Sequence, residues 1–166
     1  SIEEIFSKLR YMIVGCDCKW IVIDHLHMLV SAVTEGDERR AIDRIMTKLR
    51  SIVEETGAGI ILVSHLRRVA GNKGHEDGIQ VNLSHLRGSQ AIAQLSDCVI
   101  ALERNQQAED PAEANTTVLR VLKSRYTGDV GYATSLTYDR ETGRLTEVLS
   151  EDYEEEGTDL EFNEYA

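Results

Sequence analysis

The chain has 166 residues, a length typical of one domain, and its 42% hydrophobic and 28% charged residues are typical of a soluble globular protein. This composition excludes wholesale disorder, a collagen-like repeat and a membrane-spanning protein, and no signal peptide opens the sequence. The net charge of −11 gathers at the C-terminus, where residues 151–166 hold eight of the 29 acidic residues and neither Lys nor Arg. The first 150 residues carry 21 acidic against 18 basic residues, so the overall acidity does not exclude nucleic acid as a partner.

Three cysteines, Cys16, Cys18 and Cys98, bear on the cellular compartment. Their number is odd, and the first two are too close in sequence for an ordinary structural disulfide. Free thiols are typical of a reducing environment. We therefore expect an intracellular protein with no membrane partner.

Helical and strand patterns alternate along the N-terminal part of the chain. Apolar residues at helical spacing predict amphipathic helices over 2–13 and 42–53, the second ending near Gly57. The short apolar runs at 20–24 and 59–65 predict strands that are buried on both faces of a parallel sheet.

The following residues change from a loop to strands with two-residue alternation. The sequence predicts a mobile, glycine-containing loop over 66–86, a short helix over 87–96, a third buried strand over 98–103, and strands over 117–123, 133–138 and 144–148. This order predicts an α/β fold with a mostly parallel sheet flanked by helices and a C-terminal antiparallel β extension.

In such a sheet, chemistry gathers at the carboxyl ends of the parallel strands. Asp24 ends the first predicted strand, where a carboxylate can hold Mg²⁺ on nucleotide phosphates through water or merely cap the next turn. His65 follows the second, where a neutral imidazole can donate a hydrogen bond to a terminal phosphate or merely close the strand. His25 and His27 have a spacing that also suits a metal site, but no Cys or acidic cluster completes it.

Five segments that occur in one order carry a resemblance to a known family. They are DHLHMLVS at 24–31, LVSHLRR at 62–68, LRGSQAIAQLSD at 86–97, ALERNQ at 101–106 and LKSRYTGDVG at 122–131. Together they resemble the replicative helicases of the DnaB-like, RecA-fold superfamily, most closely the helicase half of short-tailed phage primase-helicases, with mitochondrial Twinkle a more distant relative. The resemblance implies a partial RecA-like helicase ATPase domain over residues 1–150.

The resemblance implies roles for residues at the strand ends. Asp24 matches the Walker B aspartate that holds magnesium through water, and His65 matches the phosphate-sensing histidine. Gln94 matches the glutamine that links the terminal phosphate to the DNA-binding loop. The implied cofactor is Mg²⁺ with ATP or dTTP, in the cytoplasm of an infected host cell.

The resemblance also implies residues that act between subunits of a ring, a hexamer in the parent protein. Arg125 matches the arginine finger inserted into the adjacent subunit's nucleotide site, and Lys123 lies close to the same phosphates. Arg104 and Tyr138 match the pair that holds the nucleotide base. An arginine supplied by a neighbour contributes about a thousandfold or more in rate and makes hydrolysis depend on assembly; a plain surface arginine is the alternative for Arg125.

The loop that follows the second predicted strand carries Arg67, Arg68, Asn72 and Lys73. The family grips single-stranded DNA with this loop in the central channel of the ring. Backbone phosphates attract such cations without sequence preference, and no aromatic residue between 66 and 86 offers base stacking. We expect mainly electrostatic contact with DNA, with a solvated basic loop as the alternative.

Two features depart from the family pattern. The chain contains no G-x-x-x-x-G-K-[ST] sequence and no Gly-Lys pair. We expect the phosphate cradle, and the acidic residue that activates water, to lie upstream of Ser1, and we predict that the chain does not hydrolyse ATP alone. Ala93 stands where the phage enzymes carry a basic residue, which puts one phosphate or DNA contact in doubt.

The acidic residues 151–166 contain Tyr153, Phe162 and Tyr165. Phage helicase tails of this kind engage their DNA polymerase, and a disordered, solubilising tail is the alternative. For the whole chain two functional classes remain, a ring-forming motor that unwinds DNA and a non-catalytic module for binding single-stranded DNA or for assembly. Recombinase or circadian-type ATPases of the same fold match the quoted motifs less well.

Overall fold

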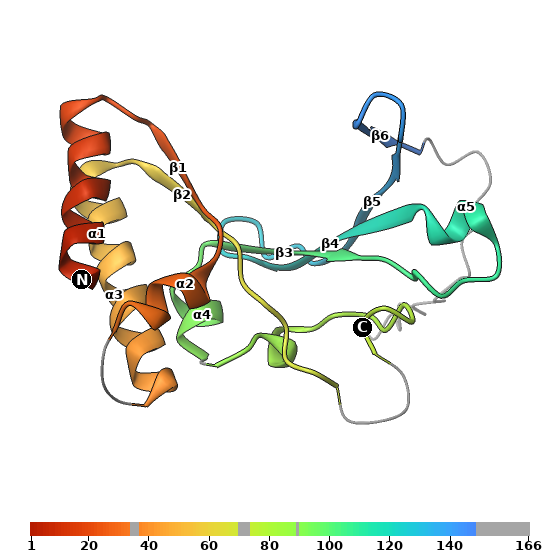
Figure 1. Cartoon of the computed structure of the whole chain (residues 1–166), viewed down its shortest axis with the longest axis horizontal. Coiled ribbons are helices and arrows are strands. Elements are labelled where there is room, and N and C mark those ends of the chain that lie inside the picture. Colours follow the sequence, from red (N-terminus) through yellow and green to blue (C-terminus); the bar gives the residue numbers. More distant parts are fainter. Residues whose placement is uncertain (34–36, 70–73, 89, 149–166) are drawn as a thin grey trace, which may run out of the picture.

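The computed structural model describes residues 1–33, 37–69, 74–88 and 90–148. Figure 1 shows helices α1 and α3 at one end of the molecule and an antiparallel sheet that extends toward the other end. The helices are α1 (Ile2–Arg10), α2 (Leu26–Ser31), α3 (Glu38–Thr56), α4 (Gln90–Leu95) and α5 (Pro111–Ala114), with a π-helical turn at Tyr11–Gly15 and a 3₁₀ turn at Leu83–His85. The strands are β1 (Trp20–Ile23), β2 (Gly59–Leu62), β3 (Cys98–Glu103), β4 (Thr116–Ser124), β5 (Gly131–Tyr138) and β6 (Leu145–Glu147).

Strands β1 and β2 form a parallel pair whose two faces differ. The register runs from Trp20 beside Gly59 to Ile23 beside Leu62. Ile21 is buried against the helices, whereas Trp20 and Val22 are 69% and 65% exposed. Successive side chains of a strand point to opposite faces. Among the described residues, helices therefore cover the face that carries Ile21 and leave the face of Trp20 and Val22 open. The prediction that these strands are buried on both faces was therefore wrong.

Helix α3 supplies most of the apolar surface that covers β1 and β2. Its buried side chains pack with those of α1 and α2 into one core, which contains Phe6, Leu9, Ile21, Leu26, Leu29, Ile42, Ile45, Met46, Leu49 and Ile52. The Asp37 carboxylate accepts a hydrogen bond from the Arg39 backbone N–H at its start, and Gly57 ends it with φ +71°. The prediction of this helix and of its end at Gly57 is confirmed, and α3 begins earlier than the first apolar residue of the predicted pattern.

Strands β3, β4, β5 and β6 form an antiparallel sheet in that order. The predicted antiparallel extension is confirmed, but it also includes β3, which pairs with β4 along its length. Ile100 and Leu102 of β3 are 55% and 61% exposed, because no described element covers that face. The prediction of a third buried strand was wrong in this respect, while the α/β class with a parallel and an antiparallel part is confirmed.

Two local features were not predicted from the sequence. Helix α2 directly follows β1 and buries Leu26 and Leu29. In the predicted loop over 66–86, the described residues are tied down by a bridge between Leu66 and Leu86 and by the buried Val81. No helix within the described residues is both long and apolar enough to cross a membrane.

Candidate functional site

The carboxyl ends of β1 and β2 bring Asp24 and His65 to one edge of the parallel pair. The Val63 N–H donates to the Ile23 carbonyl at 2.9 Å. The segments that follow β1 and β2 therefore stay paired one residue beyond the strands. The His25 ring stacks on the His65 ring with centroids 4.0 Å apart, and its Nδ1 lies 3.8 Å from Asp24 Oδ1. The Asp24 side chain is 75% exposed. A carboxylate and an imidazole therefore face solvent together, as the strand-end argument predicts.

His27 extends this edge into a stack of three imidazole rings. Its ring centroid lies 5.4 Å from that of His65. The His27 side chain is 11% exposed, with Nε2 3.6 Å from Glu38 Oε1. Burial lowers the pKa of His27, the positive charge of Arg87 lowers it further, and Glu38 acts in the opposite direction. The His27 imidazole is thereby favoured in its neutral form.

The histidine stack does not form a metal site. Stacked rings place their faces together, whereas ligands must direct nitrogen lone pairs at one point. Among the described residues no group of three His, Cys, Asp or Glu side chains could hold a metal ion. A hollow of about 260 Å³ lies beside the stack, lined by His27, Val30, Ser31, Val33, Glu38, Ala41 and Arg87. His27 lines this hollow, whereas Asp24 and His65 do not.

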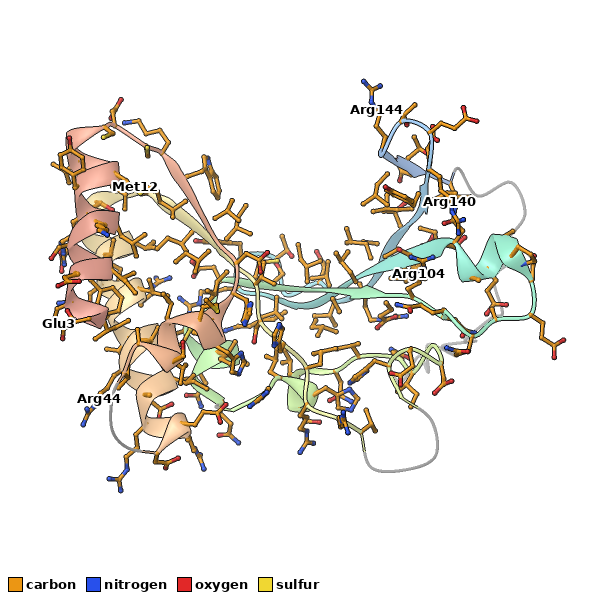
Figure 2. The ribbon with its side chains drawn as sticks, in the orientation of Figure 1. Glu3, Met12, Arg44, Arg104, Arg140 and Arg144 are labelled. Atoms are coloured by element: carbon orange, nitrogen blue, oxygen red, sulfur yellow. The ribbon has the colours of Figure 1, made fainter. Side chains whose placement is uncertain are left out.

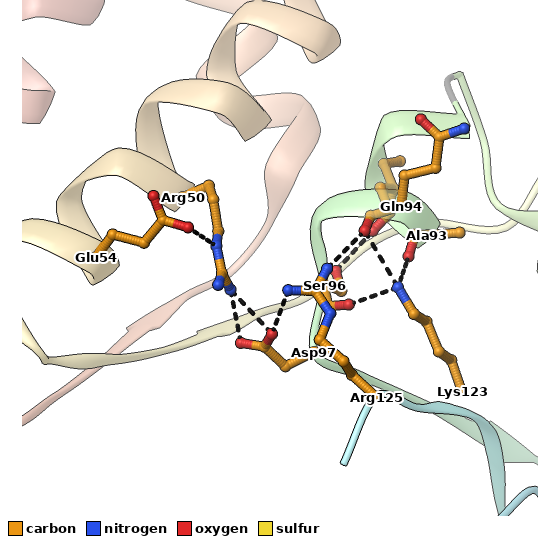
Figure 3. A network of polar contacts seen from close by, with 9 residues as sticks. Arg50, Glu54, Ala93, Gln94, Ser96, Asp97, Lys123 and Arg125 are labelled. Carbon is orange, nitrogen blue, oxygen red and sulfur yellow. Dashed lines mark hydrogen bonds and ion pairs between the residues drawn. The ribbon is translucent and has the colours of Figure 1, made fainter. Parts of the chain in front are cut away.

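Helix α4, which carries Gln94, is fixed at its C-terminal end by cations from the end of β4 (Figure 3). Lys123 Nζ donates to the carbonyls of Ala93 at 2.6 Å, Gln94 at 3.2 Å and Ser96 at 2.8 Å. Arg125 Nη2 donates to the Gln94 carbonyl at 3.0 Å. The last carbonyls of a helix lack partners within it, so these cations satisfy them.

The Gln94 side chain points away from those cations in Figure 3. Within the described residues no hydrogen bond or ion pair joins it to Asp24 or His65. The structure thus brings Gln94, Lys123 and Arg125 together through the backbone of α4.

Arg104 and Tyr138 lie at the opposite end of β4 from Lys123. Arg104 Nε donates to the Ala114 carbonyl at 2.7 Å, and Asn115 Nδ2 donates to the Tyr138 carbonyl at 2.8 Å. Figure 2 places Arg104 near α5, away from α1 and α3. At about 3.3 Å per residue the length of β4 separates the two ends by roughly 25 Å.

The segment after β2 presents two of the four predicted DNA-binding side chains. Arg67 and Arg68 are exposed. The Arg67 N–H donates to the His85 carbonyl at 2.8 Å, so the backbone is fixed while the guanidinium group stays in solvent. Asn72 and Lys73 lie outside the described residues.

Two charged residues at this site were missed from the sequence. The Asp97 carboxylate accepts hydrogen bonds from Arg50 and forms an ion pair with Arg125. Asp97 belongs to a motif that carries the resemblance, so its place in that motif was a usable signal. No such signal in the sequence pointed to Arg50, because it is one of several charged residues on the polar face of α3.

Comparison with known proteins identifies the family. Residues 1–147 match the family model of the DnaB-like helicase C-terminal domain. The chain belongs to this family. It is 47% identical over 143 residues to the DNA helicase/primase of Enterobacteria phage T3. This DnaB-like domain spans 25% of that relative's length, and 86% of the present chain takes part in the match. The resemblance to the C-terminal part of phage primase-helicases is confirmed.

Solved structures confirm the fold of this DnaB-like domain. A DnaB-like replicative helicase, described together with its interactions with primase, matches with a TM-score of 0.70 and 24% identity over 87% of this chain and 35% of that one. A KaiC-like protein from Pyrococcus horikoshii matches with a TM-score of 0.63 and 15% identity over 90% of this chain and 57% of that one. At these identities the likeness concerns the RecA-like fold.

Proposed function

We propose that this DnaB-like domain is the C-terminal part of a ring-forming replicative DNA helicase, which couples NTP hydrolysis to translocation on single-stranded DNA and to duplex unwinding. The observation that carries the proposal is the position of the exposed Asp24 carboxylate and the His65 ring, each next to His25, at the carboxyl ends of two adjacent parallel strands. RecA-like folds bind ligands at such strand ends. Membership of the family and the likeness to a phage helicase/primase support it.

Asp24 is the residue that would hold Mg²⁺ in this function. A solvent-exposed carboxylate, with no cluster of metal-ligating side chains among the described residues, suits an ion that keeps most of its water and binds ATP or dTTP phosphates. Bound magnesium neutralises charge on the transferred phosphoryl group. His65, which follows the neighbouring strand β2, would donate a hydrogen bond to the terminal phosphate.

The remaining roles divide between two subunits. Gln94 reports the terminal phosphate within its own subunit, whereas Arg125 and Lys123 act on the phosphates held by a neighbour. Arg104 and Tyr138, at the far end of β4, hold a nucleotide base. The wide separation of the two ends of β4 supports assigning Arg104 and Tyr138 to a different nucleotide from Lys123 and Arg125, because one nucleotide cannot readily meet both.

Single-stranded DNA is the proposed nucleic-acid ligand. It would be bound by Arg67, Arg68, Asn72 and Lys73. The exposed guanidinium groups of Arg67 and Arg68 support this assignment. The domain would comprise residues 1–150, and the protein would act in the cytoplasm of an infected host cell.

Hydrolysis is tested with Asp24→Asn in a full-length protein that carries this chain after a P-loop. We expect DNA-stimulated NTP turnover and unwinding to fall by about a hundredfold or more, because the variant loses the charge that orients magnesium. Single-stranded DNA binding and ring assembly are the controls. The purified chain alone should show no turnover, and robust magnesium-dependent turnover by it, abolished by Asp24→Asn, would contradict the prediction.

A non-catalytic module for single-stranded DNA binding or assembly is the second candidate. The absence of G-x-x-x-x-G-K-[ST] from the sequence favours it for the isolated chain. DNA binding that persists in a full-length protein with no turnover under any nucleotide would identify this second function.

The acidic residues 151–166, which lie outside the described residues, are proposed to bind the replicative DNA polymerase. Their eight negative charges suit a basic patch on that partner. Deletion of 151–166 is expected to weaken polymerase binding, measured by surface plasmon resonance, and to leave the melting temperature unchanged. Equal binding with and without the segment would remove this role.

A further inference from the structure

Asp97 joins two guanidinium groups that come from different parts of the fold (Figure 3). It follows α4 and precedes β3. Arg50 Nη1, from α3, donates to both carboxylate oxygens at 2.9 and 2.8 Å. Arg125 Nη1, from just beyond β4, lies 2.9 Å from Asp97 Oδ1. The Asp97 side chain is 30% exposed.

Asp97 also holds the backbone of Arg125. The Arg125 N–H donates to the Asp97 carbonyl at 2.8 Å. The second guanidinium nitrogen, Nη2, donates to the Gln94 carbonyl. Both the backbone and the head of Arg125 are thus fixed to the turn between α4 and β3. A long side chain with several rotatable bonds loses most of its freedom under such restraint.

The two arginines play unequal parts in this network. Arg50 is less exposed than Arg125, at 25% against 40%, and its Nε also donates to Glu54 at 2.7 Å. Arg50 therefore holds Asp97 in place through two hydrogen bonds, whereas Arg125 forms a single ion pair with it.

We propose that Asp97 is a positioning residue for Arg125 and that Arg50 anchors Asp97 to α3. This inference rests on the proposed role of Arg125 as the group supplied to a neighbour's nucleotide. Asp97 holds the guanidinium at a defined place on the rim of α4, from which the exposed side of the group reaches a phosphate. Displacement of a transition-state group by about 1 Å can cost a hundredfold in rate, so a restraint on Arg125 acts on kcat.

The test measures kcat and KM for DNA-stimulated NTP hydrolysis in the full-length ring. Asp97→Asn should lower kcat by about 10- to 100-fold with KM unchanged, since Arg125 acts in the transition state. Asp97→Glu keeps the charge and should recover much of kcat. Glu54→Gln is the matched control, because it removes a partner of Arg50 that contacts neither Asp97 nor Arg125, and it should match the wild type.

Arg125→Ala separates failure of this inference from failure of the proposed function. If Arg125→Ala loses turnover while Asp97→Asn keeps the wild-type kcat, only the positioning role of Asp97 is overturned. If Arg125→Ala keeps full turnover, the arginine-finger assignment on which that role rests is overturned. Where Asp97→Asn does not assemble, Arg50→Gln decides, because it leaves Asp97 without its anchor. Reduced kcat at unchanged KM in Arg50→Gln supports the inference, and unchanged kcat overturns it.

Discussion

His27 shows how single side chains in this domain respond to pH. Burial lowers its pKa, Arg87 adds to the lowering, and Glu38 opposes it. The folded chain therefore binds a proton at His27 less readily than the unfolded chain. The resulting stabilisation is fully present above the ordinary histidine pKa of about 6.5 and is lost as the pH falls below that value.

Urea denaturation at about pH 7.5 and about pH 5.5 tests this response. We expect the free energy of unfolding of the wild type to fall on acidification, and His27→Gln, which does not titrate, to lose less. The comparison is needed because burial also lowers the pKa of His85, with further lowering by His75 and Arg67. Equal losses in the two proteins would show that His27 does not contribute.

Residues at strand ends could be predicted, and residues that meet across the fold could not. Asp24 and His65 were found because a parallel sheet places its carboxyl ends at one edge. The contact of Arg50 with Asp97 joins positions 47 apart in sequence, and nothing local marks such a pair. The contacts of Arg125 within its own chain could not be predicted either. Its partners include backbone carbonyls, which every residue type has.

At the scale of elements, α3 is the helix on which the parallel pair depends. Ile52 is fully buried within the core. Ile52→Ala should lower the free energy of unfolding by about 2–5 kcal/mol, because it removes buried surface and leaves a cavity. Lys48→Ala on the exposed face of α3 is the control and should change it by less than about 0.5 kcal/mol. Urea denaturation gives both values, and equal effects would contradict the packing described for α3.

Helical spacing and alternation located most of the elements but not their neighbours. Short apolar runs gave β1, β2 and β3, yet such runs do not tell how many faces are covered. One face of these strands is not covered by any described element, and it exposes the apolar side chains of Trp20, Val22, Ile100 and Leu102. Helix α2 was missed because its six residues are too few to show a helical period clearly.

Across the whole molecule, the proposed catalytic groups reach the surface at separate places. Asp24 and His65 lie at the end of the parallel pair, and Arg125 lies where β4 ends beside α4. Arg125 is held there by Asp97 and the Gln94 carbonyl within its own chain. A site completed by a neighbouring chain would account for this arrangement, because the Arg125 side chain is 40% exposed and its contacts among the described residues do not include Asp24 or His65.

Mixing two inactive variants of the full-length ring tests this sharing most directly. Asp24→Asn subunits keep Arg125 but have a defective nucleotide site, and Arg125→Ala subunits have the reverse defect. If Arg125 acts in a neighbour's site, mixed rings contain interfaces with both groups intact, and NTP turnover should rise well above that of either variant alone. Mixed rings verified by native mass spectrometry that show no gain in turnover would contradict it.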